Sequence, residues 1–145
     1  YIKPRLESFG GPDNWAAANA MAALVEGLAG VKNEGLAFDK VALSPRWTSA
    51  GIDSVNATIR YAASDGYVAY RYQHHPALKE IRVTFTGSGQ SVKNHILLPV
   101  GNSGIVSITS NDQPVAFTTS RIEESSYADF DLSLPQIQNV IIRYK

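Results

Sequence analysis

Apolar and polar residues follow two different patterns along this chain. Between Pro12 and Val31 the apolar positions recur at helical spacing and fall on one stripe when the segment is drawn at about 100° per residue. That stripe consists of Met21, Leu24, Val25 and Leu28. Beyond about Phe38 the period changes to two residues, which is typical of strands. The pattern therefore predicts one helix followed by a β-rich region.

Residues at both ends of the first segment fit a helix. Pro12 suits the first turn, where its missing N–H costs nothing, and Asp13 places a carboxylate at the positive end of the helix dipole. Gly30 is a suitable stop, because glycine adopts the left-handed conformation that ends many helices.

The side of this helix opposite the apolar stripe carries small residues instead of charges. It consists of Ala16, Asn19, Ala20, Ala22, Ala23 and Glu26. A helix that is small or apolar nearly all round is normally buried on more than one side, and a single β-layer covers only one side. We therefore expect the helix to pack against further helices that belong to a larger protein.

Alternating segments separated by turn residues predict roughly eight or nine strands, spaced as in an antiparallel sandwich or barrel. They are 36–43, 55–61, 67–72, 81–86, 92–100, 105–109, 115–122, 127–134 and 140–144. Asp65-Gly66 predicts a two-residue hairpin turn between two of them. The predicted fold is mainly β: a jelly-roll-like antiparallel β-sandwich, with one N-terminal α-helix packed on it because the connection is short.

Composition excludes several classes of protein. The formal net charge is zero, so the basic surplus of a nucleic-acid-binding protein is absent. The Ala-rich helix is too short for a membrane span, and no other apolar run approaches the length that one needs. The chain has no cysteine, which excludes disulfides and thiolate metal sites. We expect neither a nucleic-acid nor a membrane partner.

Two short motifs carry a resemblance to a known group of enzymes. They are EGLAGV at residues 26–31 and LSPRW at residues 43–47, followed by the all-β tail. This arrangement resembles the C-terminal end of glycoside hydrolases and phosphorylases with an (α/α)6 barrel. Bacterial α-L-rhamnosidases, debranching-type glucosidases and maltose phosphorylases belong to this group. In these families a last barrel helix leads through a short strand into a C-terminal β-sandwich.

The resemblance implies a division of the chain and a function. Residues 1–35 would be the last helix of a six-hairpin helical barrel, and residues 36–145 a C-terminal β-sandwich domain. The chain would then be the structural or accessory domain of a bacterial carbohydrate-active enzyme, a glycoside hydrolase, and would be non-catalytic alone. Its partners would be carbohydrate and the missing helical barrel. The compartment stays undetermined, with a periplasmic or extracellular location favoured.

The same resemblance points to candidate site residues before and at the start of the helix, at the mouth of the barrel. It implies Glu7 as a general base, and Asp13, Asn14 and Trp15 as substrate-binding residues. A glycine-rich turn that enters a helix presents free N–H groups, and a carboxylate there could activate water. Structural interpretations stay open: a solvated carboxylate for Glu7, a helix-end charge for Asp13 and a helix-to-sheet anchor for Trp15.

A stand-alone carbohydrate-binding module is the alternative function. It predicts a helix that is covered without a partner and an exposed row of aromatic residues among Tyr67, Tyr70 and Tyr72. Such tyrosines also commonly serve as cross-strand packing pairs. We predict no metal or cofactor site, because His74 and His75 are adjacent on a strand and would point to opposite faces.

Overall fold

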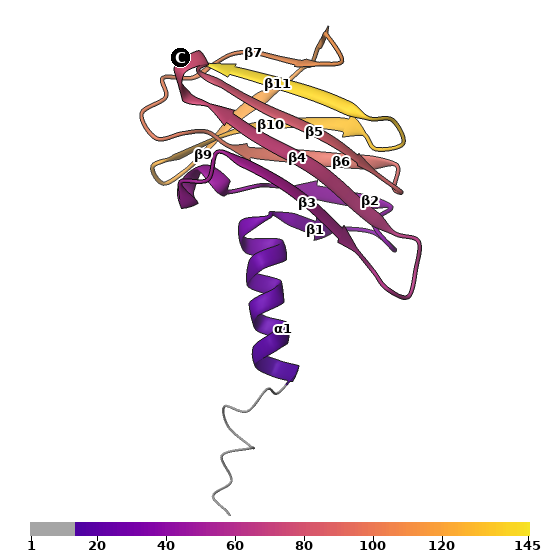
Figure 1. Cartoon of the computed structure of the whole chain (residues 1–145). Coiled ribbons are helices and arrows are strands. Elements are labelled where there is room, and N and C mark those ends of the chain that lie inside the picture. The colour runs from indigo at the N-terminus through magenta and orange to yellow at the C-terminus, as the bar shows by residue number, and fades with distance from the viewer. Residues whose placement is uncertain (1–13) are drawn as a thin grey trace, which may run out of the picture.

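A computed structural model describes residues 14–145, which form a β-sandwich of two sheets with one helix leaving it (Figure 1). The five-stranded sheet contains, in spatial order, β1 (Val31–Asn33), β2 (Lys40–Leu43), β6 (Ser91–Leu97), β10 (Ser125–Ser133) and β9 (Thr118–Ile122). The six-stranded sheet contains β3 (Ser54–Arg60), β4 (Tyr67–His75), β5 (Glu80–Gly87), β11 (Gln138–Tyr144), β7 (Ile105–Ser110) and β8 (Gln113–Pro114). The predicted β-sandwich is confirmed.

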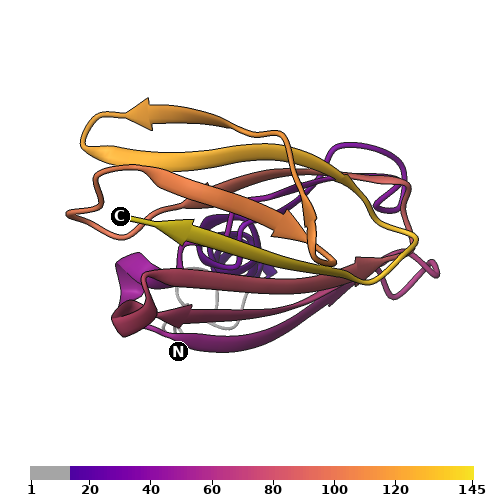
Figure 2. The ribbon, with the colours of Figure 1, turned by 90° about the horizontal axis from the view of Figure 1, so that it is seen from above.

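The strand pairing is antiparallel throughout the described residues with one exception, the parallel pair of β2 and β6. Seen from above, the two sheets form separate layers and the helix is viewed end-on (Figure 2). Two short 3₁₀ turns, Trp47–Ala50 and Pro76–Leu78, lie in connections of this sandwich.

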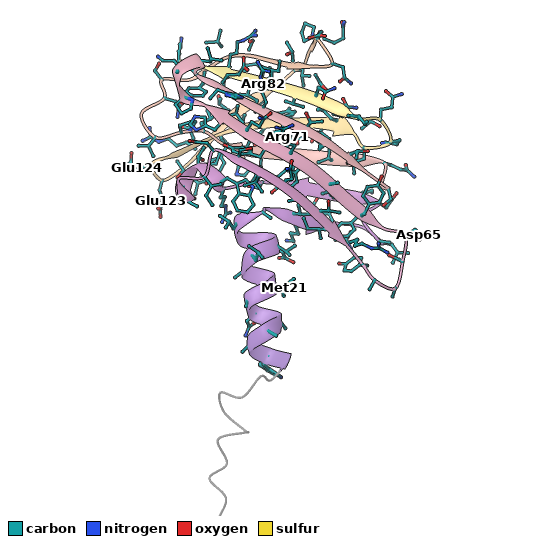
Figure 3. The ribbon with its side chains drawn as sticks, viewed as in Figure 1. Met21, Asp65, Arg71, Arg82, Glu123 and Glu124 are labelled. Atoms are coloured by element: carbon teal, nitrogen blue, oxygen red, sulfur yellow. The ribbon has the colours of Figure 1, made fainter. Side chains whose placement is uncertain are left out.

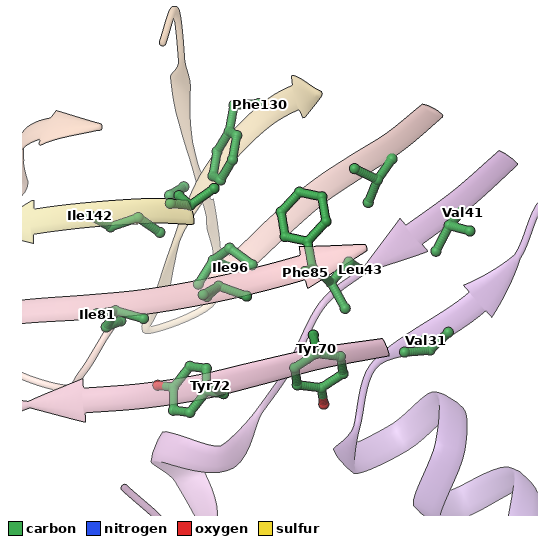
Figure 4. Close-up of a cluster of buried hydrophobic side chains, with 14 of the residues drawn as sticks. Val31, Val41, Leu43, Tyr70, Tyr72, Ile81, Phe85, Ile96, Phe130 and Ile142 are labelled. Carbon is green, nitrogen blue, oxygen red and sulfur yellow. The ribbon is translucent and has the colours of Figure 1, made fainter. Parts of the chain in front are cut away.

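The two-residue period of the strands builds the core between the sheets. On β4 the side chains of Val68, Tyr70 and Tyr72 point inward, whereas Tyr67 and Arg71 are exposed. Inward residues of both sheets meet in one apolar cluster (Figure 4). Its labelled members are Val31, Val41, Leu43, Tyr70, Tyr72, Ile81, Phe85, Ile96, Phe130 and Ile142. Burial of this apolar surface is the main stabilising term of the fold.

Helix α1 (Asn14–Ala22) continues through a wider π-type turn (Ala23–Leu28) and ends before Gly30. It leaves the sandwich at the edge where β1 and β3 lie and projects away from it (Figure 1). Packing of the helix on the sandwich is therefore confined to its last turn, where Val25 and Leu28 contact the core. The predicted stop is confirmed, since Gly30 has a φ of +67°.

Three local predictions of the sequence pattern are wrong. Residues 36–43 do not form one strand, because Ala37 and Phe38 have positive φ and only Lys40–Leu43 are extended. The hairpin between β3 and β4 does not have a two-residue turn, because six residues separate the strands. Tyr61 still donates its backbone N–H to the Gly66 carbonyl across this loop, and its ring stacks on Phe38. Residues 115–122 do not form one strand either, because the chain crosses there from one sheet to the other.

Candidate functional site

Of the four candidate site residues that the sequence suggests, the structure describes two. Glu7 and Asp13 lie outside the described residues, and Asn14 is the first residue of α1. The Trp15 side chain is described and is 80% exposed. Its interpretation as an anchor between helix and sheet is therefore wrong, because it lies on the projecting part of α1. The roles of Glu7, Asp13, Asn14 and Trp15 toward a substrate stay predictions.

Both faces of α1 are exposed. Trp15, Met21 and Leu24 are 80%, 59% and 49% exposed, and the alanines at positions 16, 20, 22 and 23 are exposed as well. Met21 lies on the projecting helix (Figure 3). A surface helix of a globular protein normally buries its apolar stripe and places charged residues on the other side. In the described helical segment the second face carries mostly alanine, and of the apolar stripe only Val25 and Leu28, in the π-type turn, contact the core.

The end of this helical segment is fixed to the sandwich by four hydrogen bonds, which we call the helix clamp. Two are backbone bonds: Ser44 N–H donates to the Gly30 carbonyl at 2.7 Å, and Arg46 N–H donates to the Leu28 carbonyl at 3.0 Å. Two involve buried side chains. Trp47 Nε1 donates to the Tyr70 hydroxyl at 2.8 Å, which donates in turn to the Ala29 carbonyl at 2.7 Å.

The helix clamp joins the two motifs EGLAGV and LSPRW side by side. A Cβ on Gly30 would lie 1.9 Å from the Ser44 carbonyl oxygen, so only glycine permits this approach. Trp47 is 7% exposed and donates to Tyr70 of β4, which holds the helix end against that strand. Burial raises the pKa of Tyr70 to about 12, so its hydroxyl stays protonated and keeps donating. The clamp therefore fixes the direction in which α1 leaves the sandwich.

A groove of about 390 Å³ runs between α1 and the edge strand β3. Its floor contains the stacked rings of Phe38 and Tyr61, whose centroids lie 4.8 Å apart. The helix contributes Met21, Ala22, Val25 and Glu26 to one wall, and β3 contributes Thr58, Ile59 and Arg60 to the other. The projecting helix and this groove form one continuous surface with a mostly apolar centre.

A second polar cluster links Asp53, His74 and Tyr144. The Nδ1 atom of His74 lies 3.1 Å from Asp53 Oδ1, and Nε2 lies 2.8 Å from the Tyr144 hydroxyl. A carboxylate–histidine–hydroxyl chain has the order of a nucleophile triad. Burial, and then the negative charge of Asp53, raise the pKa of Tyr144. Its hydroxyl is therefore not activated, and the cluster serves to join β4 to β11.

A third cluster surrounds the buried carboxylate of Glu80, which bonds to Arg82 and lies 3.3 Å from Arg143 Nε. Burial alone would raise the pKa of this carboxyl, but the hydrogen bond and charge of Arg82 and the charge of Arg143 outweigh it, and the pKa is lowered. Arg82 lies on the outward side of the six-stranded sheet (Figure 3). The two arginines therefore compensate the buried charge of the one carboxylate, and the cluster has a structural role within the six-stranded sheet.

The row of exposed tyrosines that the alternative function predicts is absent from the described strands. Tyr70 and Tyr72 are 4% and 1% exposed and belong to the core, and only Tyr67, at 36%, reaches the surface. The histidines do not come together either, since His74 lies on the six-stranded sheet and His95 on the five-stranded sheet. Within residues 14–145 no group of three acidic or histidine side chains is placed to hold a metal ion.

The outward face of the five-stranded sheet carries one feature that the sequence pattern did not reveal. His95 and Asp129 are cross-strand partners there, and Ser120 bonds to the same carboxylate.

Among the described helices, none has the length and apolarity that crossing a bilayer requires. No protein-family model, no curated protein and no solved structure matches the chain.

Proposed function

We propose that the chain is the C-terminal structural domain of a carbohydrate-active enzyme, a glycoside hydrolase whose catalytic helical domain contacts α1. The observation that carries this proposal is the exposure of α1 on both faces. Fully burying a large apolar side chain stabilises a protein by about 1.5–3 kcal/mol. The exposed Trp15, Met21 and Leu24 thus represent several kcal/mol that only a partner surface can recover.

The helix clamp supports the same proposal. A flexible tail with apolar residues needs no hydrogen bonds to hold its direction, whereas a helix that docks with other helices gains from a fixed one. Bonds among Ala29, Trp47 and Tyr70 hold the end of the helical segment. Its exposed Trp15, Met21 and Leu24 and its alanine face thus stay accessible to neighbouring helices. Small residues on the second face allow such neighbours to approach closely.

The choice of enzyme class rests on the resemblance of EGLAGV and LSPRW to the end of (α/α)6-barrel enzymes. These two motifs meet in the helix clamp. The sandwich would then buttress the barrel, and Glu7 would lie at its mouth. The alternative, a stand-alone carbohydrate-binding module, requires a helix that is covered without a partner and a tyrosine row, and the described residues contain neither.

Hydrogen–deuterium exchange tests this proposal directly. In the 145-residue chain alone, amides of residues 15–24 should exchange much faster than those of β4 and β5, because only the last turn of the helical segment is packed. In the protein expressed from the complete natural reading frame, the same amides should be protected at least tenfold more strongly.

Two results would overturn the proposal. One is a natural reading frame that contains no helical-hairpin domain before Tyr1. The other is a full-length protein in which residues 15–24 exchange as fast as in the 145-residue chain. If the helix is protected, replacement of Glu7 by Gln in the full-length enzyme should abolish glycoside hydrolysis without altering that protection, as expected for a general base.

A further inference from the structure

The five-stranded sheet carries an open trough on the face that points away from the core. Buried residues Val92, Ile96 and Phe130 belong to the core, so the alternate residues of β6 and β10 point outward. The trough has a volume of about 740 Å³, within the range of small-molecule sites. It is lined by Ala42, Lys93, Asn94, His95, Ala116, Phe117, Thr118, Asp129, Phe130 and Asp131.

Strand register brings the polar groups of this trough together. In the antiparallel pair of β6 and β10, His95 lies opposite Asp129 and Lys93 lies opposite Asp131. Directly opposed residues on one face of a sheet have neighbouring side chains. Two carboxylates, an amine and an imidazole therefore line one short stretch of the trough. The Lys93 ammonium also lies 3.8 Å from the Glu34 carboxylate, so acidic groups outnumber basic ones there.

Asp129 is held in a defined orientation. Its Oδ1 accepts from His95 Nδ1 at 2.5 Å, and its Oδ2 accepts from the Ser120 hydroxyl at 2.5 Å. An ionised carboxylate has about four acceptor positions, so further positions stay open on both oxygens. The side chains of Asp129 and His95 are 28% and 32% exposed, which leaves them accessible from the trough.

The imidazole of His95 is fixed as well. Its ring stacks on Tyr127 with centroids 4.0 Å apart and planes inclined by 10°. Because an ionised carboxylate only accepts hydrogen bonds, His95 Nδ1 carries a proton and donates it in the hydrogen bond to Asp129. No hydrogen bond of Nε2 occurs within the described residues. This atom is therefore left as an oriented group for a ligand.

The order of these side chains argues for binding rather than covalent catalysis. Asp129 lies between His95 and Ser120, whereas activation of a serine requires the histidine between carboxylate and hydroxyl. Ser120 therefore has no base beside it. What the cluster offers is a rigid set of acceptors and donors.

Phe117 adds an apolar surface at the trough. It lies in the segment that crosses from β8 to β9, and it is 37% exposed. An aromatic ring beside oriented polar groups suits a ligand that has C–H faces and hydroxyl edges. The surplus of carboxylates disfavours an anionic ligand, and their acceptor oxygens suit a neutral ligand whose hydroxyl groups donate hydrogen bonds.

We propose that this trough binds a neutral saccharide of a few sugar units. Asp129 and Asp131 accept hydrogen bonds from sugar hydroxyls, Lys93 donates one, and Phe117 packs on a C–H face of a ring. The choice of a saccharide as ligand rests on the proposed function. The site would add to that function a direct contact between this domain and carbohydrate. The geometry of the trough does not involve α1.

The test is binding of the fluorescently labelled 145-residue chain to a microarray of neutral and acidic oligosaccharides, with titration calorimetry on the neutral glycans that it retains. Asp131→Asn and Phe117→Ala should each weaken the affinity at least tenfold, because they remove an acceptor and the stacking ring. Asp65→Asn, at an exposed carboxylate of the β3–β4 hairpin, and Leu78→Ala, at a residue that is 65% exposed, are the matched controls and should bind as the parent does (Figure 3). Thermal unfolding of all four variants verifies that each is folded.

Three outcomes would overturn the inference: no neutral glycan bound, acidic glycans bound exclusively, or neutral glycans bound equally well by the two trough variants. The exchange experiment on α1 separates this failure from that of the proposed function. Protection of residues 15–24 together with an inert trough refutes only the saccharide site. An unprotected helix together with trough-dependent binding refutes only the attachment to a helical domain.

Discussion

The helix and the sandwich use the same kinds of apolar residue and treat them oppositely. Trp15 and Leu24 on the helix are 80% and 49% exposed, whereas Trp47 and Leu43 in the sandwich are 7% and 0% exposed. The inward residues of the two sheets cover one another, and the helical segment adds only its end, Val25, Leu28 and the following Ala29, to that core. The helix has no such counterpart among the described residues. These exposed apolar residues are the reason for proposing a partner surface for the helix.

The junction between the helix and the sandwich is rigid, so the exposure of the helix does not result from a loose attachment. Ala29 and Gly30 are buried, and their carbonyl groups accept hydrogen bonds from Tyr70 and Ser44. Exposure begins within one turn of the buried residues. A rigid joint next to an uncovered helix is what a docking element needs, because its direction is set before the partner arrives.

The same substitution, leucine to alanine, should change the free energy of unfolding far more in the sandwich than in the helix. Leu43→Ala should lower the free energy of unfolding by about 2–5 kcal/mol, because it removes a fully buried side chain and leaves a cavity. Leu24→Ala in the same 145-residue chain should change it by less than about 0.5 kcal/mol. Urea unfolding monitored by tryptophan fluorescence measures both. Equal losses would mean that Leu24 is buried in solution, which would remove the contrast.

The next largest effect is expected at the joint itself. Gly30→Ala should cost more than about 2 kcal/mol, because φ is +67° there and the new methyl group would meet the Ser44 carbonyl oxygen at 1.9 Å. Gly27→Ala is the matched control: its Cβ meets nothing within 4 Å, so the change should be neutral or should stabilise by up to about 1 kcal/mol. Thermal unfolding of both variants decides. A tolerated Gly30→Ala would show that the two motifs do not approach as closely as described.

A smaller loss is expected when the joint keeps its shape but loses its side-chain hydrogen bonds. Tyr70→Phe leaves Trp47 Nε1 and the Ala29 carbonyl without their partner, which should cost about 1–3 kcal/mol. Tyr67→Phe, on the outward side of the same strand, should change stability by less than about 0.5 kcal/mol. Thermal unfolding gives both values, and exchange at residues 23–29 should rise in Tyr70→Phe alone. Unchanged exchange there would contradict the clamp.

The alternation of apolar and polar residues was enough to predict most of the sandwich. Strands β3, β5 and β7 lie within about two residues of their predicted positions, because each has a clean period of two between turn residues. Strand β1 was missed because Lys32 and Asn33 resemble a turn, and only their pairing with β2 makes them a strand. The tight β7–β8 hairpin is consistent with its residue types, because Asn111 and Asp112 both have positive φ, which asparagine and aspartate tolerate.

The candidate surfaces were predictable to different degrees. The uncovered helix followed from its own sequence, because a small or apolar residue at nearly every position conflicts with a single covering layer. The trough could not be predicted, since His95 and Asp129 are 34 positions apart and meet only through the register of β6 and β10. A shift of β10 by one residue against β6 would turn Asp129 into the core while His95 stayed outside, so the pair would be lost. No local pattern specifies such a register.

The smallest expected effect concerns a charge that the sandwich buries. Glu80 is 4% exposed and its pKa is lowered in the folded chain, so the ionised form favours folding above the unfolded-state pKa of about 4.3. That contribution should be lost as the pH falls through the lower folded-state pKa. Glu80→Gln should therefore be less stable than the parent near neutral pH, and the two should converge toward pH 3.

Urea unfolding between pH 3 and 7 measures this convergence. The matched control is Glu26→Gln, at an exposed carboxylate of the helix, whose acid unfolding should follow that of the parent. A Glu80→Gln curve parallel to the parent at every pH would mean that Arg82 and Arg143 contribute through packing rather than through the charge of Glu80. If the stability of Glu26→Gln converged with that of the parent as the pH fell, Glu26 would have a charged partner within the chain. That result would contradict the contrast between an uncovered helix and a self-contained sandwich.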